Sequence, residues 1–403
     1  MRLSMMERRT VTKALCEQYR KAGKKGKGVI LDEFVKAAGY NRSYAGRLLR
    51  NHGRRVVVSP GVVLEGDARR RKAAPRKRVY SKDVKQALMR LWRIMDYISS
   101  KRLKAALPAL LERLEACKEP LPGKTVRGKL LRISAATIDR LLKEERGKHA
   151  LKGRGHTKPG TLLKHQIPLR TYSDWDDPCP GFLEMDLVGH DGGSLKGDFC
   201  YTLDMTDVAS GWSEQAAVMN KAQMHVFAGI QALRARLPFG VLGLDSDNGG
   251  EFINAHMQRY CAEHRIAFTR SRPYRKNDSC YVEQKNWSIV RRFAGYARFE
   301  SPNACIALND LYALVRDYNN FFFPSMKLKE KIRDGARVQK RYHPAKTPYQ
   351  RLLESPTVTA AEKEKLRARY QKLNPAELHR KIIAQQKKLS ALAAKRQGQG
   401  DAA

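Results

Sequence analysis

The spacing of hydrophobic residues near the start of the chain predicts helices. Between residues 10 and 51 apolar positions recur at helical intervals, and Gly39 separates one run from the next. Phe34, Ala45 and Leu48 are expected to form the contacts between these helices. The pattern therefore predicts a helical module with a sharp turn at Gly39.

Polar residues on the second of these runs give the module a candidate function. Arg42, Ser43 and Arg47 would lie on its outer face, as in a helix-turn-helix that offers one helix to a DNA groove. Residues 80–146 repeat the theme, because their last part also resembles a helix-turn-helix. The sequence thus predicts two DNA-binding modules in tandem, at residues 1–65 and 80–146. An ordinary helical hairpin fits the first pattern nearly as well.

The middle of the chain changes to short apolar and alternating runs, which predict an α/β domain. Strands are expected at 182–188, 199–206, 211–218, 241–244 and 266–269, and helices at 221–237, 250–264 and 278–297. The first three strands follow one another directly and should pair in antiparallel fashion. This order of elements matches a ribonuclease H-like fold.

The rest of the chain is expected to contain a small basic β module and a helical tail. Asp334-Gly335 lies between two runs rich in Lys and Arg, 325–332 and 337–342, which is a hairpin signal. The tail is helical by pattern from 360 to 395 and is broken near Asn374-Pro375. The tail would serve as a coiled-coil or bundle contact. The expected division is 1–65 helix-turn-helix module, 66–79 basic linker, 80–146 second helical module, 147–175 basic linker, 176–320 α/β core, 321–356 β module and 357–403 tail.

Charge points to a nucleic-acid partner. The 79 Lys and Arg residues outnumber the 40 Asp and Glu residues, which leaves a formal charge of +39. Such an excess favours a polyanion through counterion release. Ribosomal and histone-like proteins are equally basic, so charge alone does not separate an enzyme from a packaging protein.

Two composition features narrow the class of protein further. The seven cysteines are scattered without a Cys-x-x-Cys pair, which argues against a zinc site and a disulfide framework. No apolar run approaches the roughly 18 residues of a membrane span, and the start lacks the apolar segment of a signal peptide. We therefore expect no membrane association and a cytoplasmic, nucleoid-associated protein.

Three acidic residues are the candidates for chemistry. Asp186 lies midway along the first expected strand, Asp247 follows the fourth, and Glu283 lies on the last helix of the α/β region. A carboxylate within a central strand is costly without a cation. Transfer of a DNA phosphoryl group needs carboxylates that hold two divalent ions about 4 Å apart. Asp245 competes with Asp247, because residues two apart on a strand face the same side.

These acids and their neighbours resemble the catalytic core shared by retroviral integrases and bacterial insertion-sequence transposases. That family carries an Asp, Asp, Glu triad with 35 residues between the last two acids, and 35 residues separate Asp247 from Glu283 here. The resemblance also includes Trp212 and an Asn three residues after Glu283. The His and Cys zinc pattern of retroviral enzymes is absent at the N-terminus, which indicates a bacterial transposase.

The resemblance implies a metal-dependent mechanism on DNA. Asp186 would bridge two Mg²⁺ or Mn²⁺ ions, while Asp247 and Glu283 each complete the coordination of one ion. Water would cleave a phosphodiester at a transposon end, and the exposed 3′-hydroxyl would then attack target DNA. The N-terminal helices would bind the terminal repeats, and the pairing of two ends implies at least a dimer. The sequence does not say whether a helper protein takes part.

Basic residues beside the triad complete the expected site. Arg272, Arg275 and Lys276 precede Glu283 on a loop, and Lys285 and Arg291 follow it on the helix. We expect them to form a phosphate-binding rim, with a solvated basic face as the alternative. Two other functions remain open: a ribonuclease H-like nuclease without strand transfer, and a catalytically silent DNA-binding regulator.

Overall fold

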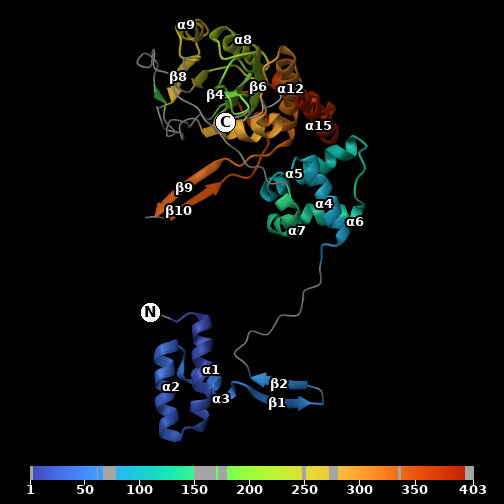
Figure 1. The fold of residues 1–403 in the computed structure, drawn as a ribbon. Helices are drawn as coiled ribbons and strands as arrows, with labels where there is room; N and C mark the ends of the chain where they lie inside the picture. The colour runs from blue at the N-terminus through green and yellow to red at the C-terminus, as the bar shows by residue number, and fades with distance from the viewer. Residues whose placement is uncertain are drawn as a thin grey trace, which may run out of the picture. The chain divides into compact units, whose positions relative to one another are not determined.

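The structure is a computed structural model that describes residues 3–60, 62–66, 79–148, 169–170, 179–246, 251–271, 280–334 and 337–394. Contacts divide the chain into two compact units, Met1–Val79 and Tyr80–Ala403, each of which is described by itself (Figure 1). No helix among the described residues is long and apolar enough to span a membrane.

The first unit contains three helices and a hairpin. Its elements are α1 (Met5–Lys21), α2 (Lys24–Ala38), α3 (Arg42–Asn51), β1 (Arg54–Ser59) and β2 (Val62–Gly66). Gly39 ends α2 in the left-handed conformation, with a φ of 65°, which suits a residue without a Cβ. Asn41 then caps α3 by accepting a hydrogen bond from the Ser43 backbone N–H. The helices and the turn at Gly39 are confirmed, whereas the hairpin was not predicted.

The core of this unit corrects one predicted contact. Phe34 and Ala45 are fully buried, as expected, and so is Leu49. Leu48 is only half-buried. Ala45 and Leu49, four residues apart, are buried on the inner face of α3, and Leu48 lies at the edge of that face.

A six-stranded sheet organises the described part of the second unit. The strand order is β3-β8-β7-β4-β5-β6. The strands β4, β5 and β6 pair in antiparallel fashion, and β4, β7 and β8 pair in parallel. The bounds are β3 (Leu169–Arg170), β4 (Phe182–Gly189), β5 (Tyr201–Asp207), β6 (Ser213–Val218), β7 (Gly243–Ser246) and β8 (Ala267–Ser271). All five predicted strands and the antiparallel pairing of the first three are confirmed, whereas β3 was not predicted.

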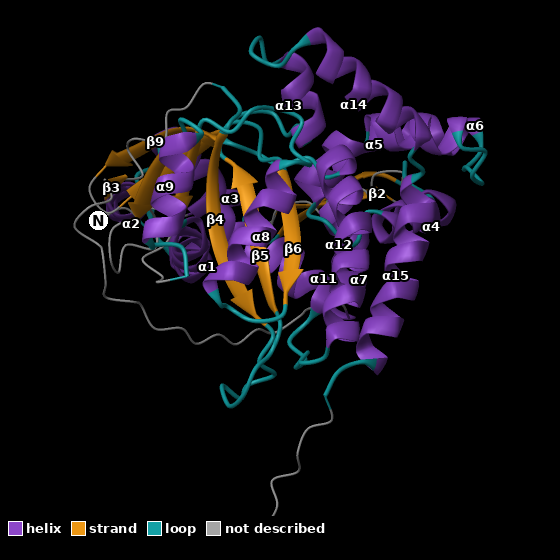
Figure 2. Cartoon of the chain, turned by 90° about the horizontal axis from the view of Figure 1, so that it is seen from above, coloured by secondary structure: helices purple, strands orange, loops and turns teal. Residues whose placement is uncertain are grey.

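Helices cover both faces of this sheet, as Figure 2 shows. On one face, α8 (Gln223–Arg234) and α9 (Ala255–Glu263) share a hydrophobic core with inward residues of β4 and β5. The other face contacts α10 (Cys280–Lys285), the π-helix η2 (Asn286–Arg291) and α12 (Pro302–Phe322). The layered α/β core of the prediction is therefore present.

The helix expected at 278–297 is not one regular helix. Its described part consists of α10, the π-helical segment η2 and the short α11 (Arg292–Ala294). A π-helical turn changes the angular spacing of side chains, and such turns often occur at functional sites. Here it allows Asn286 to reach the sheet while Ile289 and Phe293 stay in the core.

The helix α12 was missed by the sequence prediction. Ser301 caps it by accepting a hydrogen bond from the Ala304 N–H, and Pro302 occupies its first turn. Leu308, Leu311 and Val315 are completely buried on its inner side. These cap and periodicity signals were present in the sequence and would have identified the helix.

The helices of residues 80–148 pack against the α/β core. They are α4 (Lys82–Ile94), α5 (Ser100–Ala116), α6 (Lys124–Arg132) and α7 (Ala135–Lys148). Their buried residues belong to the same hydrophobic cluster as those of α12. The Tyr318 hydroxyl of α12 donates a hydrogen bond to the Ile94 carbonyl. This part of the chain thus belongs to one compact unit with the sheet.

The C-terminal segment completes the unit. The predicted hairpin is confirmed as β9 (Leu328–Asp334) and β10 (Arg337–Tyr342), and it extends away from the sheet in Figure 1. It is followed by α13 (Pro348–Glu354), α14 (Ala360–Lys372) and α15 (Pro375–Ala391), and Asn374 caps α15 at the predicted break. The buried Arg113 of α5 donates a hydrogen bond to the Leu373 carbonyl at 2.7 Å. The tail helices are therefore fixed to the helical layer, since α15 also contacts α12.

Candidate active site

Asp186 lies in the middle of β4, on the face that contacts α10. Leu183 and Met185 alternate with it and point into the opposite core beneath α8 and α9. In the antiparallel pair, Asp186 is directly opposite Asp204 of β5. The half-buried Asp186 carboxylate therefore lies on a polar stripe of an otherwise apolar sheet, as the alternation predicted.

A hydrogen bond joins Asp186 to the helix that carries Glu283. The Asn286 side-chain amide donates to Asp186 Oδ2 at 2.5 Å. Glu283 is exposed on α10 three residues before Asn286. Residues three apart on an α-helix are neighbours on its surface. The structure therefore places the Glu283 segment beside the strand that carries Asp186.

Glu184 anchors the same helix from the sheet. Its side chain is fully buried, and Oε2 accepts a hydrogen bond from the Val282 backbone N–H at 2.7 Å. Burial raises the pKa of Glu184 well above its usual range, and the nearby Asp245 and Glu283 raise it further. Oε1 has no hydrogen-bond partner in the part of the chain that the structure describes. Its burial and the hydrogen bond from Val282 give Glu184 the role of a cap for α10.

Asp204 is a buried acid that the sequence reasoning did not single out. It is fully buried, and the Gln215 side-chain amide donates to its Oδ1 at 3.0 Å. Burial raises the pKa of Asp204 to about 7. Its position between Leu203 and Met205 in the middle of β5 was the available signal.

Lys285 was expected on an exposed phosphate-binding rim, but it is partly buried. Burial lowers the pKa of Lys285 to about 8, and the attraction of Asp204 opposes this effect. The ammonium group therefore lies within electrostatic reach of Asp204, the buried acid opposite Asp186 on β5. Sequence periodicity does not predict that Lys285 lies near Asp204, because Asp204 belongs to β5, a strand distant in the sequence.

Arg291, the other rim residue on this helix, supports the end of β4. Its guanidinium donates to the Gly189 carbonyl at 2.8 Å and lies 5.0 Å from the centre of the Tyr296 ring. The side chain is half-buried. Arg291 therefore makes its contacts within the protein, to the end of β4 and to Tyr296.

Four predicted residues lie outside the described residues: Asp247, Arg272, Arg275 and Lys276. Asp245, the competitor of Asp247, is buried on β7 and accepts a hydrogen bond from the Thr269 hydroxyl. No group of three His, Cys, Asp or Glu side chains suited to a metal ion occurs among the described residues. The assignment of the triad therefore stays a prediction.

The three DNA-binding candidates of the first unit are on the surface. Arg42, Ser43 and Arg47 are all exposed on α3. Arg42 also forms an ion pair with Asp32 of α2. An exposed ion pair contributes little to stability, so this contact does not prevent Arg42 from meeting a phosphate.

The sheet order and the acidic stripe on β4 define the class of protein: an α/β core of the integrase type. Residues 179–276 match the sequence model of the family described as "Integrase core domain". The chain belongs to the DDE-type family of integrase-like and transposase-like proteins. A Sinorhizobium fredii relative, described as "Uncharacterized protein y4rM", is 41% identical over 350 residues, which cover 87% of this chain and 96% of the relative.

Solved structures of viral integrases are also similar to parts of the chain. The catalytic core domain of BIV integrase is 20% identical, with a TM-score of 0.29, and the match covers 47% of this chain and 97% of that one. The magnesium complex of the HTLV-2 integrase catalytic core in its dimeric form is 13% identical, with a TM-score of 0.27, covering 36% and 89%. The fold is identified by the strand order of the sheet and not by these similarities.

Proposed function

We propose that the protein is a DNA transposase that cleaves at the ends of a mobile element and joins them to target DNA. The observation that carries this proposal is the Asn286–Asp186 hydrogen bond, which brings the Glu283 segment to the strand of Asp186 in an integrase-type core. A basic chain with a formal charge of +39 suits a DNA substrate. Its site of action would be the bacterial nucleoid.

The residue types of the proposed triad suit divalent metal ions. Asp186, Asp247 and Glu283 would hold two Mg²⁺ or Mn²⁺ ions, because hard cations prefer carboxylate oxygens. The buried Glu184, two residues before Asp186 on β4, has one oxygen on the Val282 N–H and one that lacks a partner among the described residues. When bound, the metal ions supply electrostatic stabilisation of the charge that develops on the phosphate.

The neighbouring residues of the chain orient this site. Asn286 holds one Asp186 oxygen, so that the carboxylate keeps a fixed direction. Glu184 holds the start of α10 through the Val282 N–H, which positions Glu283 relative to β4. These contacts pre-organise the acids before DNA binds, which reduces the reorganisation needed during the reaction.

DNA contacts would be divided among separate parts of the chain. Arg42, Ser43 and Arg47 on α3 would meet the terminal repeats, as the recognition helix of a helix-turn-helix does. Arg272, Arg275 and Lys276, which precede Glu283 in the sequence, would contact phosphates near the scissile bond. Lys285 and Arg291 would support the site from within the fold. Two copies of the chain would pair the two ends of the element.

The test is an assay with labelled terminal-repeat DNA and purified full-length protein in Mg²⁺ or Mn²⁺. We expect wild type to cleave and join the DNA, and Asp247→Asn and Glu283→Gln each to lose at least about 10²-fold in joining. Glu364→Gln on α14 is the control, because this acid has an exposed side chain remote in sequence from the site. Cleavage without joining by the wild type would identify a nuclease instead. Binding without cleavage would identify a silent DNA-binding regulator.

A further inference from the structure

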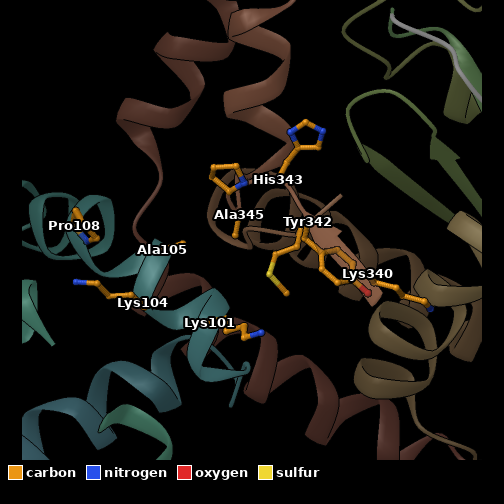
Figure 3. A pocket seen from close by; sticks show the side chains of 10 residues that line it. Lys101, Lys104, Ala105, Pro108, Lys340, Tyr342, His343 and Ala345 are labelled. Atoms are coloured by element: carbon orange, nitrogen blue, oxygen red, sulfur yellow. The ribbon is translucent and has the colours of Figure 1, made fainter. Parts of the chain in front are cut away.

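A groove separates α5 from the base of the β9–β10 hairpin in the second unit. Its volume is about 640 Å³, and Lys101 and Lys104 of α5 lie across it from Lys340 and Tyr342 of β10 (Figure 3). The loop after β10 adds His343 to the hairpin side of the opening. None of the described residues that line the groove is acidic. Its charge therefore favours an anion.

The groove also offers an aromatic surface. Tyr342 is 47% exposed although it lies on a strand, opposite Leu328 at an irregularity of the hairpin register. Ala105 and Pro108 form an apolar wall on the α5 side. Lysines beside an exposed ring and an apolar wall suit a nucleotide, which has both a phosphate and a flat base.

The groove is connected to the helix that carries Glu283. Lys327, next to the lining residue Met326, lies 5.8 Å from the centre of the Tyr281 ring on α10. The Lys327 ammonium donates hydrogen bonds to the Val208 and Ala209 carbonyls. The hairpin thus starts beside α10, the helix that carries Glu283.

The exposed Tyr342 ring selects the form of DNA. In a duplex the faces of the bases are stacked on one another, whereas an unpaired strand can offer a base face to an aromatic side chain. A volume of about 640 Å³ is sufficient for a nucleotide. The groove therefore favours an unpaired strand.

We propose that this groove binds an unpaired segment of DNA, with phosphates at Lys101 and Lys340 and a base stacked on Tyr342. The source of that segment, a strand separated beside the scissile bond, rests on the proposed function. Binding itself does not, because charge and stacking act on any single strand. Lys104 is not assigned to a phosphate, because its ammonium donates a hydrogen bond to the Leu131 carbonyl at the end of α6.

The test measures binding of a fluorescent oligo-dT of about 12 nucleotides to the full-length protein in EDTA. We expect Tyr342→Ala to weaken binding by about 5- to 150-fold and Tyr342→Phe to retain it, because the ring is the stacking surface. Joint Lys101→Ala and Lys340→Ala should reduce the slope of log affinity against log salt by about 1.4, or about 0.7 for each phosphate contact. Lys387→Ala with Lys388→Ala on α15 removes the same charge outside the groove and should leave the slope unchanged.

A second measurement locates the strand directly. Iododeoxyuridine in the oligonucleotide should cross-link to Tyr342 under ultraviolet light, and mass spectrometry identifies the attached peptide. Equal losses in the α15 control, equal losses on duplex DNA, or a clear preference for oligo-rU over oligo-dT would each overturn the proposal. The binding assay contains EDTA and therefore does not depend on catalysis. A loss of oligo-dT binding that is confined to the groove variants supports the proposal even if the wild type fails to join DNA. Conversely, normal joining with no effect of the groove variants would overturn the groove alone.

Discussion

Replacing Asn286 by Ala removes the side chain that holds Asp186. In the structure the Asn286 amide donates to Asp186 Oδ2 at 2.5 Å, whereas its own Oδ1 has no hydrogen-bond partner among the described residues. Asn286 thus directs its amide N–H toward the carboxylate. Loss of this bond would remove the contact at Oδ2 and leave the Leu187 backbone N–H at Oδ1, so the carboxylate would be less firmly directed toward the proposed metal ions.

The size of the effect follows from the type of bond. A hydrogen bond to a charged group contributes about 1.5 to 3 kcal/mol, which corresponds to about a 10- to 150-fold change in an equilibrium constant. Loss of an outer partner of a metal ligand typically costs about 10- to 100-fold in metal affinity or activity. We therefore expect Asn286→Ala to raise the Mg²⁺ concentration that gives half-maximal cleavage by about 10- to 100-fold.

The assay is a Mg²⁺ titration of cleavage of labelled terminal-repeat DNA at saturating DNA. Gln284→Ala is the matched control, because it removes an exposed amide from the same helix. We expect the control to keep the wild-type Mg²⁺ requirement. If Asn286→Ala also keeps it, or if both variants shift equally, the positioning of Asp186 by Asn286 is refuted. Circular dichroism of both variants checks that the sheet and helices are retained.

Two further predictions concern stability. Arg113→Ala should lower the free energy of unfolding by about 3 kcal/mol in urea, because it removes a buried guanidinium that donates to the Leu373 and Gln371 carbonyls. Arg380→Ala, a largely exposed ion-pair member, should cost less than about 1 kcal/mol. Burial lowers the pKa of His190 to about 3, so the unfolded chain binds its proton first as the pH falls below 6.5. At pH 5 this should cost about 2 kcal/mol relative to pH 7, and His190→Gln should remove that loss.

The His190 prediction depends on comparison with the variant. Burial raises the pKa of Asp204 to about 7, so this acid binds its proton more readily in the folded protein and stabilises it as the pH falls. The two effects have opposite signs in the same pH window. Comparison of wild type with His190→Gln isolates the contribution of the histidine. If the variant loses as much free energy of unfolding between pH 7 and pH 5 as the wild type does, the prediction for His190 is contradicted. If Arg380→Ala lowers the free energy of unfolding as much as Arg113→Ala does, the prediction for Arg113 is contradicted.

The elements of the α/β core could be predicted from the sequence because their signals are local. Alternation along 182–188 put Leu183 and Met185 on one face and Asp186 on the other, and the structure has this arrangement. The turn at Gly39 and the hairpin at Asp334 were predicted for the same reason, since each depends on a few adjacent residues. The helix α12 was missed although its signals were equally local.

What lies against each polar side chain was decided by the tertiary structure alone. Lys285 has the sequence context of a surface lysine, and only the packing of α10 on β5 brings it near Asp204. Glu184 alternates with apolar residues as a solvated acid would, yet α10 covers it and takes its oxygen as a cap. Likewise, the helices of 80–148 share a core with α12, which no local pattern could show.

The sequence by itself determined which elements form and which residues carry acidic or basic groups, because periodicity and turn chemistry act over a few residues. The strand order placed Asp186 in the centre of the sheet and Glu283 on a helix beside it. The tertiary structure decided which charges are buried and which contacts orient the acids. Those depend on contacts between residues such as Asn286 and Asp186, which lie 100 positions apart in the chain.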